Sequence, residues 1–268
     1  MALELIGAVY RRGRQEPHDP WLFSPRGLDW TFVTWGEAAV LLETLAPTLA
    51  GTAGRRVAYP WRCRGEDWLF DLALCGAGAS VVPVSEESAV GLVGEAVRRR
   101  AGVLADSSCP CFAPPPGERR RLAAGEWLVS TEAHGGEWWG EAEAARAVER
   151  LSSVLGTSRG RDIALSSGRL EEASVRAFLS WATVSGAAVL FEPSRHRFLA
   201  TVRWARPTVL LVSTAVRREL AGELGAARRR RLDGRRGRLR TLVLAEPGDL
   251  RDDERALWDA ARVRLVSP

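Results

Sequence analysis

Lysine is absent from this chain of 268 residues, so all 38 of its basic residues are arginine. Asparagine is absent as well. Without lysine the protein cannot form a Schiff base, use a lysine as a general base or hold a phosphate with an ammonium group. The formal net charge of +5 allows contact with anions but does not require it.

Cysteine is scarce, with four residues, which is too few for a disulfide framework in a chain of this length. Cys109 and Cys111 are separated by one residue, a closer spacing than the two-residue gap of zinc knuckles. No histidine lies near them in the sequence. We therefore expect no metal site.

Long hydrophobic runs are missing, because no apolar stretch approaches the ~20 residues that span a bilayer. At the N-terminus the apolar residues of 1–14 precede the arginines, which is the reverse of a secretory signal. The composition, 46% hydrophobic and 26% charged, excludes wholesale disorder. We expect a cytoplasmic protein without membrane contact.

Short β-rich runs alternate with segments of helical period along most of the chain. Residues 34–49 begin with a threonine cap signal and place apolar side chains on one face. The glycines of 76–78 are typical of a turn from a helix into a strand. The expected strands are 56–59, 80–84, 102–105, 127–130, 162–165, 187–191, 208–212, 241–244 and 263–266. The expected helices are 34–49, 66–75, 88–100, 141–155, 171–185, 195–205, 214–224 and 252–261.

This alternation predicts the fold class and the domain organisation. Strands separated by crossover helices require an α/β fold with mainly parallel sheets and helices on both faces. Residues 106–125 (DSSCPCFAPPPGERRRLAAG) interrupt the rhythm with prolines and an arginine triplet. We treat residues 1–268 as a single region in which this segment is the best subdomain boundary.

Three stretches carry a resemblance to a known family. The first is 29–37 (DWTFVTWGE), followed by GRRVA at 54–58 and GAGASVVPV at 76–84. The second is 185–193 (SGAAVLFEP), and the third is 206–216 (RPTVLLVSTAV). Together they are collinear over residues 20–266. In this order they resemble the N-terminal domain of the adenylate-forming superfamily, which contains the AMP-dependent synthetases and ligases and the acyl-CoA synthetases.

The resemblance implies a site for ATP and Mg²⁺, but the corresponding stretch here has changed. The family binds the nucleotide with a Ser/Thr/Gly-rich phosphate loop that ends in Pro-Lys-Gly, and its backbone amides surround the phosphates. The matching stretch here is 130–140 (STEAHGGEWWG). Its matching positions, which we take as the remnant cofactor-binding residues, are Ser130, Thr131 and Gly135.

Other residues of the same stretch depart from the family pattern. Glu132 and Glu137 introduce negative charges that repel phosphate, and no lysine is present to offset them. Trp138 and Trp139 replace small residues that let a backbone approach a ligand closely. The expectation is therefore that binding of ATP and Mg²⁺ is lost.

Further departures concern the rest of the family's site. The stretch 165–171 (LSSGRLE) lacks the histidine and the aromatic residue of the family's turn. The chain stops before the family's adenine motif and before the small domain that carries its catalytic lysine. The resemblance thus implies a truncated, degenerate relative with no catalytic residues. Such a protein would act by binding a protein partner, a second copy of itself or a small acyl ligand.

Two other functions stay open. One is a split ligase that is still active when another chain completes it. The other is an α/β protein that binds RNA or another anion through the arginine-rich segment 228–240. That segment contains no aromatic residue to stack on bases, so we expect a solvated loop and no nucleic-acid partner.

A hydrolase and a special role for the tryptophans are not expected. Ser166-Ser167-Gly168 lacks the preceding glycine of a G-x-S-x-G nucleophile elbow. Core packing is sufficient to explain the tryptophans of the expected helices. These are Trp68, Trp181, Trp204 and Trp258.

Overall fold

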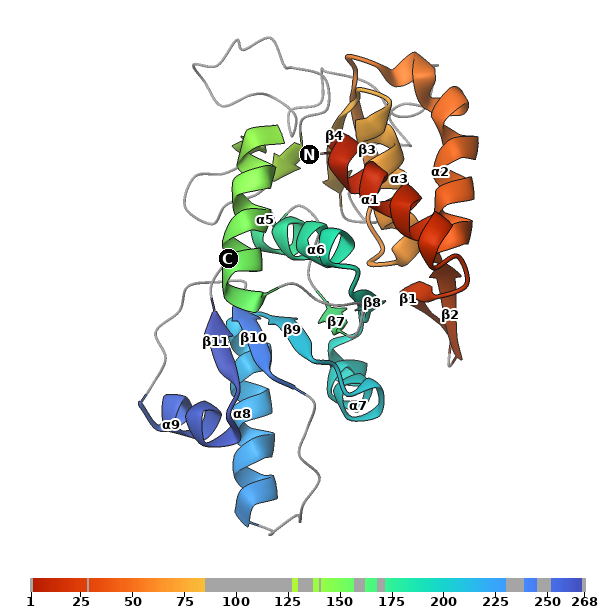
Figure 1. The fold of residues 1–268 in the computed structure, drawn as a ribbon. Coiled ribbons are helices and arrows are strands. Elements are labelled where there is room, and N and C mark those ends of the chain that lie inside the picture. Colours follow the sequence, from red (N-terminus) through yellow and green to blue (C-terminus); the bar gives the residue numbers. More distant parts are fainter. Residues whose placement is uncertain are drawn as a thin grey trace, which may run out of the picture.

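A computed structural model describes residues 2–27, 29–84, 127–129, 137–139, 141–156, 162–167, 172–229, 239–244 and 252–266. The helices are α1 (Ala2–Gln15), α2 (Trp35–Leu49), η1 (Ala50–Thr52), α3 (Gly65–Gly76), α5 (Glu141–Leu155), α6 (Ala173–Ser185), α7 (Arg195–Ala205), α8 (Thr214–Arg229) and α9 (Asp252–Ala261). The strands are β1 (Pro20–Arg26), β2 (Asp29–Thr34), β3 (Arg56–Pro60), β4 (Ser80–Val84), β5 (Trp127–Val129), β6 (Glu137–Trp139), β7 (Ile163–Ser166), β8 (Ala188–Phe191), β9 (Val209–Val212), β10 (Thr241–Leu244) and β11 (Arg264–Val266). Figure 1 shows their arrangement.

The described strands form two sheets. The larger has seven strands in the order β11-β10-β9-β7-β8-β1-β2, and all neighbours are parallel except the β1–β2 hairpin. The smaller has the order β3-β4-β5-β6, with an antiparallel pair at β5–β6. The expected α/β class with mainly parallel strands is confirmed.

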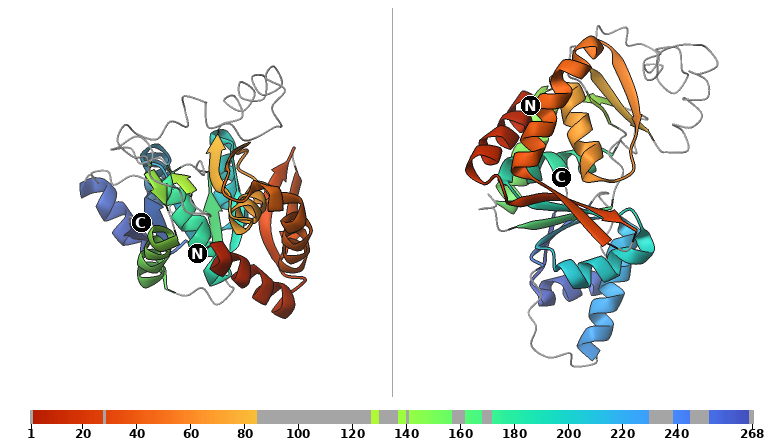
Figure 2. Two further views of the ribbon diagram at one scale, coloured as in Figure 1. Left: turned by 90° about the horizontal axis from the view of Figure 1, so that it is seen from above. Right: turned by 90° about the vertical axis from the view of Figure 1, so that its right-hand side faces the viewer.

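Helices cover both faces of the larger sheet because its side chains alternate between two apolar clusters. Leu165, Leu190 and Leu210 face α7, α8 and α9. Their neighbours Ala164 and Val189 face the opposite side, toward α5, α6 and the N-terminal helices. The right-hand view of Figure 2 shows α7 and α8 on one side of this sheet and α1, α2 and α3 on the other.

The β1–β2 hairpin joins the N-terminal part of the chain to the larger sheet. Its first strand pairs with β8, and Ser24 accepts a hydrogen bond from Gly65 N (2.8 Å) at the start of α3. The sequence pattern did not predict this hairpin. Pro20 and Pro25 in β1 predict a loop, but Pro20 is the first residue of the strand, and β1 pairs with β8 only at Leu22 and Phe23, so both prolines lie outside that pairing.

Most expected helix and strand bounds agree with the structure. At α2, Thr34 and Glu37 form the predicted start as a reciprocal capping box. One expectation is wrong: α8 continues through Arg229, so the arginine-rich segment does not begin as a loop. The expected helix 88–100, the strand 102–105 and the boundary segment 106–125 lie outside the described residues, so they stay predictions.

The tryptophans of the helices divide into two groups. Trp68, Trp181 and Trp258 are fully buried, which confirms their expected core role. The expectation for Trp204 is wrong, because 62% of this residue is exposed. On α7 it lies outside the buried stripe that contains Phe198, and it stacks on Trp30 of β2 instead, with a centroid distance of 5.6 Å.

Among the described residues, no helix is both long enough and apolar enough to cross a membrane.

Candidate functional site

The strand order of the larger sheet reverses at β7, which marks the candidate site. From β7 the chain crosses through α6 to β8 on one side, and then returns through α7 to β9 on the other side. Open parallel sheets bind ligands beyond the carboxyl ends of the strands at such a switch point. Here those ends are Ser166 on β7 and Val212 on β9.

The loop after β3 brings the carboxyl end of the smaller sheet to the same place. The thiol of Cys63 donates to the carbonyl oxygen of Ser166, with Sγ 3.9 Å away. Trp61 packs edge-on against Phe191 at the end of β8, with ring centroids 6.0 Å apart. Cys63 has a φ of 57°, a left-handed backbone conformation that non-glycine residues adopt rarely. The carboxyl ends of β3, β7 and β8 therefore meet around one buried loop.

Negative charge surrounds this meeting point. Burial raises the pKa of the Cys63 thiol far above its ordinary value of 9.0, and the nearby charges of Asp67, Glu192 and Glu172 raise it further. The thiol stays protonated at neutral pH and supplies no thiolate nucleophile. Asp67 and Glu192 are each paired with an arginine, Arg62 and Arg197, so neither arginine is left without a carboxylate partner to bind a phosphate.

Two of these carboxylates have partners that hold the local backbone. Asp67 accepts hydrogen bonds from the backbone N–H of Arg62 (2.8 Å) and from its guanidinium (2.6 Å). Glu192 is buried and accepts from Ser194 N (3.0 Å) and from the hydroxyl of Thr201 (2.9 Å). Their first role is thus to fix the loop before α3 and the start of α7.

The hydroxyl of Ser166 is an unsatisfied polar group at this edge. It is 1% exposed, and its Oγ has no hydrogen-bond partner among the residues that the structure describes. Strand alternation places the Ser166 side chain on the same face of the sheet as the side chain of Phe191, its partner in β8. The ring of Phe191 has no oxygen or nitrogen atom that could accept a hydrogen bond from this hydroxyl. A buried hydroxyl without a partner costs about 1–3 kcal/mol, and a bound polar atom would remove that cost.

A buried charged network lies behind the site and connects the two sheets. Arg176 of α6 donates to both carboxylate oxygens of Asp71 on α3, at 2.6 and 3.1 Å. The hydroxyl of Tyr59 on β3 donates to the same carboxylate at 2.8 Å. Burial and the charge of Asp71 raise the pKa of Tyr59 well above its ordinary value. The network fixes α6 against α3 and is closed to solvent.

The residues predicted to bind the nucleotide lie outside the part of the chain that the structure describes. Ser130, Thr131 and Gly135 fall in the connection between β5 and β6, together with Glu132. One assignment needs correction: Glu137, Trp138 and Trp139 belong to β6, where they pair with β5, and not to a loop. This strand was not predicted, because the two glycines before it and its short length of three residues favour a turn.

No group of three metal-binding side chains occurs within the described ranges, and Cys109 and Cys111 lie outside them. The sequence did not single out Cys63 or Glu192. Glu192 directly follows an expected strand of a parallel sheet, a position where functional side chains gather, and this signal could have identified it. Cys63 lies beyond the end of the expected strand 56–59, in a loop without such a signal.

Comparisons with known proteins place this geometry in a known fold. No protein-family model and no curated sequence matches the chain. Among solved structures, the N-terminal subdomain of NpsA from Klebsiella oxytoca matches with a TM-score of 0.66 and 18% identity, over 98% of this chain and 71% of that one. NpsA-ThdA, an artificially fused adenylation-PCP di-domain NRPS from the same organism, gives a TM-score of 0.69 and 17% identity, over 98% of this chain and 51% of that one. VinN in complex with L-aspartate gives a TM-score of 0.67 and 12% identity, over 97% of this chain and 74% of that one.

At these identities the likeness shows the fold. Nearly the whole chain has the fold of an adenylation-domain N-terminal subdomain, so the structural resemblance to the adenylate-forming superfamily is confirmed. The chain spans about half the length of the fused di-domain protein.

Proposed function

We propose that this chain is a binding protein that has kept the fold of an adenylation-domain N-terminal subdomain and has lost adenylation. It acts by binding a protein partner, which includes a second copy of the chain, or a small acyl ligand. The observation that carries the proposal is the chemistry at the switch point. The groups gathered there are a protonated thiol and carboxylates of which two, Asp67 and Glu192, already pair with Arg62 and Arg197, and the chain has no lysine.

ATP and Mg²⁺ do not fit the described part of this site. An adenylating site has to stabilise a highly anionic phosphate, and cations or oriented N–H groups do this. Here Asp67, Glu172 and Glu192 act on Cys63 at the carboxyl end of β7. In the sequence, Glu132 and Glu137 add two carboxylates in and beside the remnant phosphate loop.

Calorimetric titration tests the loss of nucleotide binding. We expect no binding of Mg-ATP up to millimolar concentration, and none of 3-hydroxyanthranilyl-AMSN. The N-terminal subdomain of NpsA is a suitable positive control, because it was solved in complex with that compound. A micromolar dissociation constant for this chain would contradict the proposal and favour the split ligase.

A restoring variant makes the test sharper. The double substitution Glu137→Gly and Trp138→Lys introduces a small residue and a cation at the start of β6, directly after the remnant loop. We expect it not to restore adenylation, because a single cation does not offset the carboxylates at the strand ends. ATP–pyrophosphate exchange by this variant would show that the rest of the site is intact.

Light scattering tests the kind of partner. A second copy predicts a dimer at micromolar concentration, whereas a different partner or an acyl ligand predicts a monomer.

A further inference from the structure

We draw no further inference here: the strongest candidate, the surface patch that Phe32 and Trp204 form beside the β2 edge of the seven-stranded sheet, is an exposed apolar face, and nothing in the part of the chain that the structure describes shows what covers it.

Discussion

Arg176 is a fully buried arginine, and its charge is balanced by the single carboxylate of Asp71. Placing two charges in an apolar interior is costly, and their attraction repays that cost only with good geometry and further hydrogen bonds. The two guanidinium contacts and the hydroxyl of Tyr59 supply that geometry. The pair therefore specifies how α6 meets α3 more than it adds net stability.

Arg176→Met should lower the free energy of unfolding by about 3–5 kcal/mol, because it leaves the charge of Asp71 buried without its cation. The triple variant Arg176→Met, Asp71→Leu, Tyr59→Phe removes the ion pair together with the hydroxyl that bonds to it and should recover most of the loss. Urea unfolding measures both. A triple variant as unstable as the single one would show that the ion pair itself is stabilising.

Stability should decrease in alkali. Burial first, and then the charge of Asp71, raises the pKa of Tyr59 well above its ordinary value of 10.0. The unfolded chain releases the proton of the Tyr59 hydroxyl near pH 10, whereas the folded protein keeps that proton to higher pH. The free energy of unfolding is therefore unaffected below about pH 10 and falls as the pH rises further. The raised pKa of Cys63 acts in the same direction from its ordinary value of 9.0 upward.

Urea unfolding between about pH 8 and 11 checks this dependence. Tyr59→Phe should be slightly less stable at pH 8, because Asp71 loses one hydrogen bond, and its stability should fall less steeply above pH 10. The same slope in both proteins would mean that other groups control the alkaline loss.

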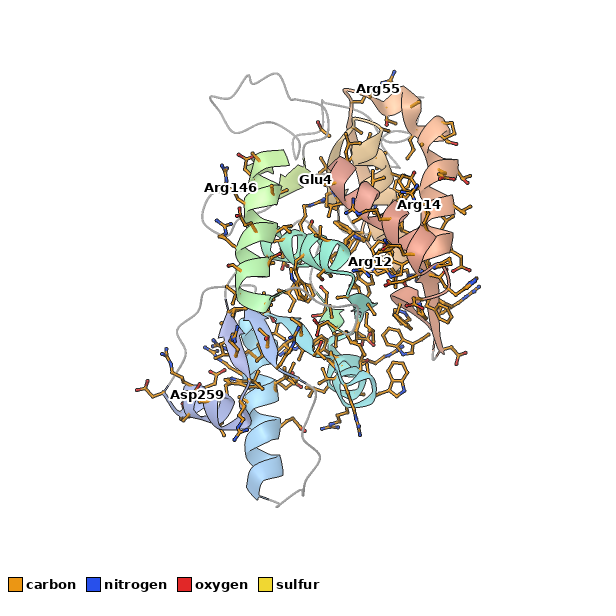
Figure 3. All side chains as sticks on the ribbon, viewed as in Figure 1. Glu4, Arg12, Arg14, Arg55, Arg146 and Asp259 are labelled. Atoms are coloured by element: carbon orange, nitrogen blue, oxygen red, sulfur yellow. The ribbon has the colours of Figure 1, made fainter. Side chains whose placement is uncertain are left out.

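At the scale of elements, the C-terminal end of α6 is held by α1. Gly186 ends α6 with a φ of 76°. The guanidinium of Arg12, labelled in Figure 3, covers this glycine and donates to the carbonyl oxygen of Ser185 at 3.1 Å. Arg12 also pairs with Glu16 (2.7 Å) and lies 5.5 Å from the ring of Trp35. A side chain at position 186 would displace the guanidinium of Arg12 from its present place.

Gly186→Ala should destabilise the protein by about 1–2 kcal/mol, chiefly through the left-handed backbone, while the end of the Arg12 side chain moves aside. A Cβ at this position would lie 1.9 Å from the Cζ of Arg12. Gly222→Ala on α8 is the opposite control, since nothing lies within 4 Å of its Cβ position. There we expect a gain of about 0.5–1 kcal/mol. Thermal melts of both variants decide whether crowding or helix propensity dominates.

At the scale of the whole molecule, the net charge of +5 depends strongly on the segment 228–240. Its last arginine, Arg240, has a structural role. Arg240 pairs with Asp162, whose carboxylate also accepts a hydrogen bond from Thr208 at 2.8 Å. This network joins the amino ends of β7, β9 and β10.

Replacing Arg230, Arg231, Arg235 and Arg236 with serine should leave the melting temperature nearly unchanged, because surface substitutions usually act within ~0.5 kcal/mol. The net charge would fall from +5 to +1, since four positive charges are removed. Arg240→Ser should instead cost about 1 kcal/mol through loss of a partly buried charged contact. Loss of a bound RNA in the quadruple variant would favour the nucleic-acid function.

The sequence predicted most elements of the fold because their signals are local. Thr34 and Glu37 marked the start of α2, and valine-rich runs marked β4 and β9. The collinear family stretches predicted the adenylation-domain fold. For the candidate site, the sequence pointed to the residues around Ser130 and could not identify Cys63, since a lone cysteine in a loop has no distinctive pattern.

The sequence by itself determined the α/β alternation, the absence of lysine and the change in the phosphate-loop stretch. The tertiary structure decided what those elements bring together. Cys63 and Ser166 meet although 103 positions separate them, and Trp204 leaves the core to stack on Trp30. Hydrophobic periodicity and capping act over a few residues and fix which face of an element is apolar. The choice of which distant faces pack depends on the fit of whole elements, and only the folded chain contains that information.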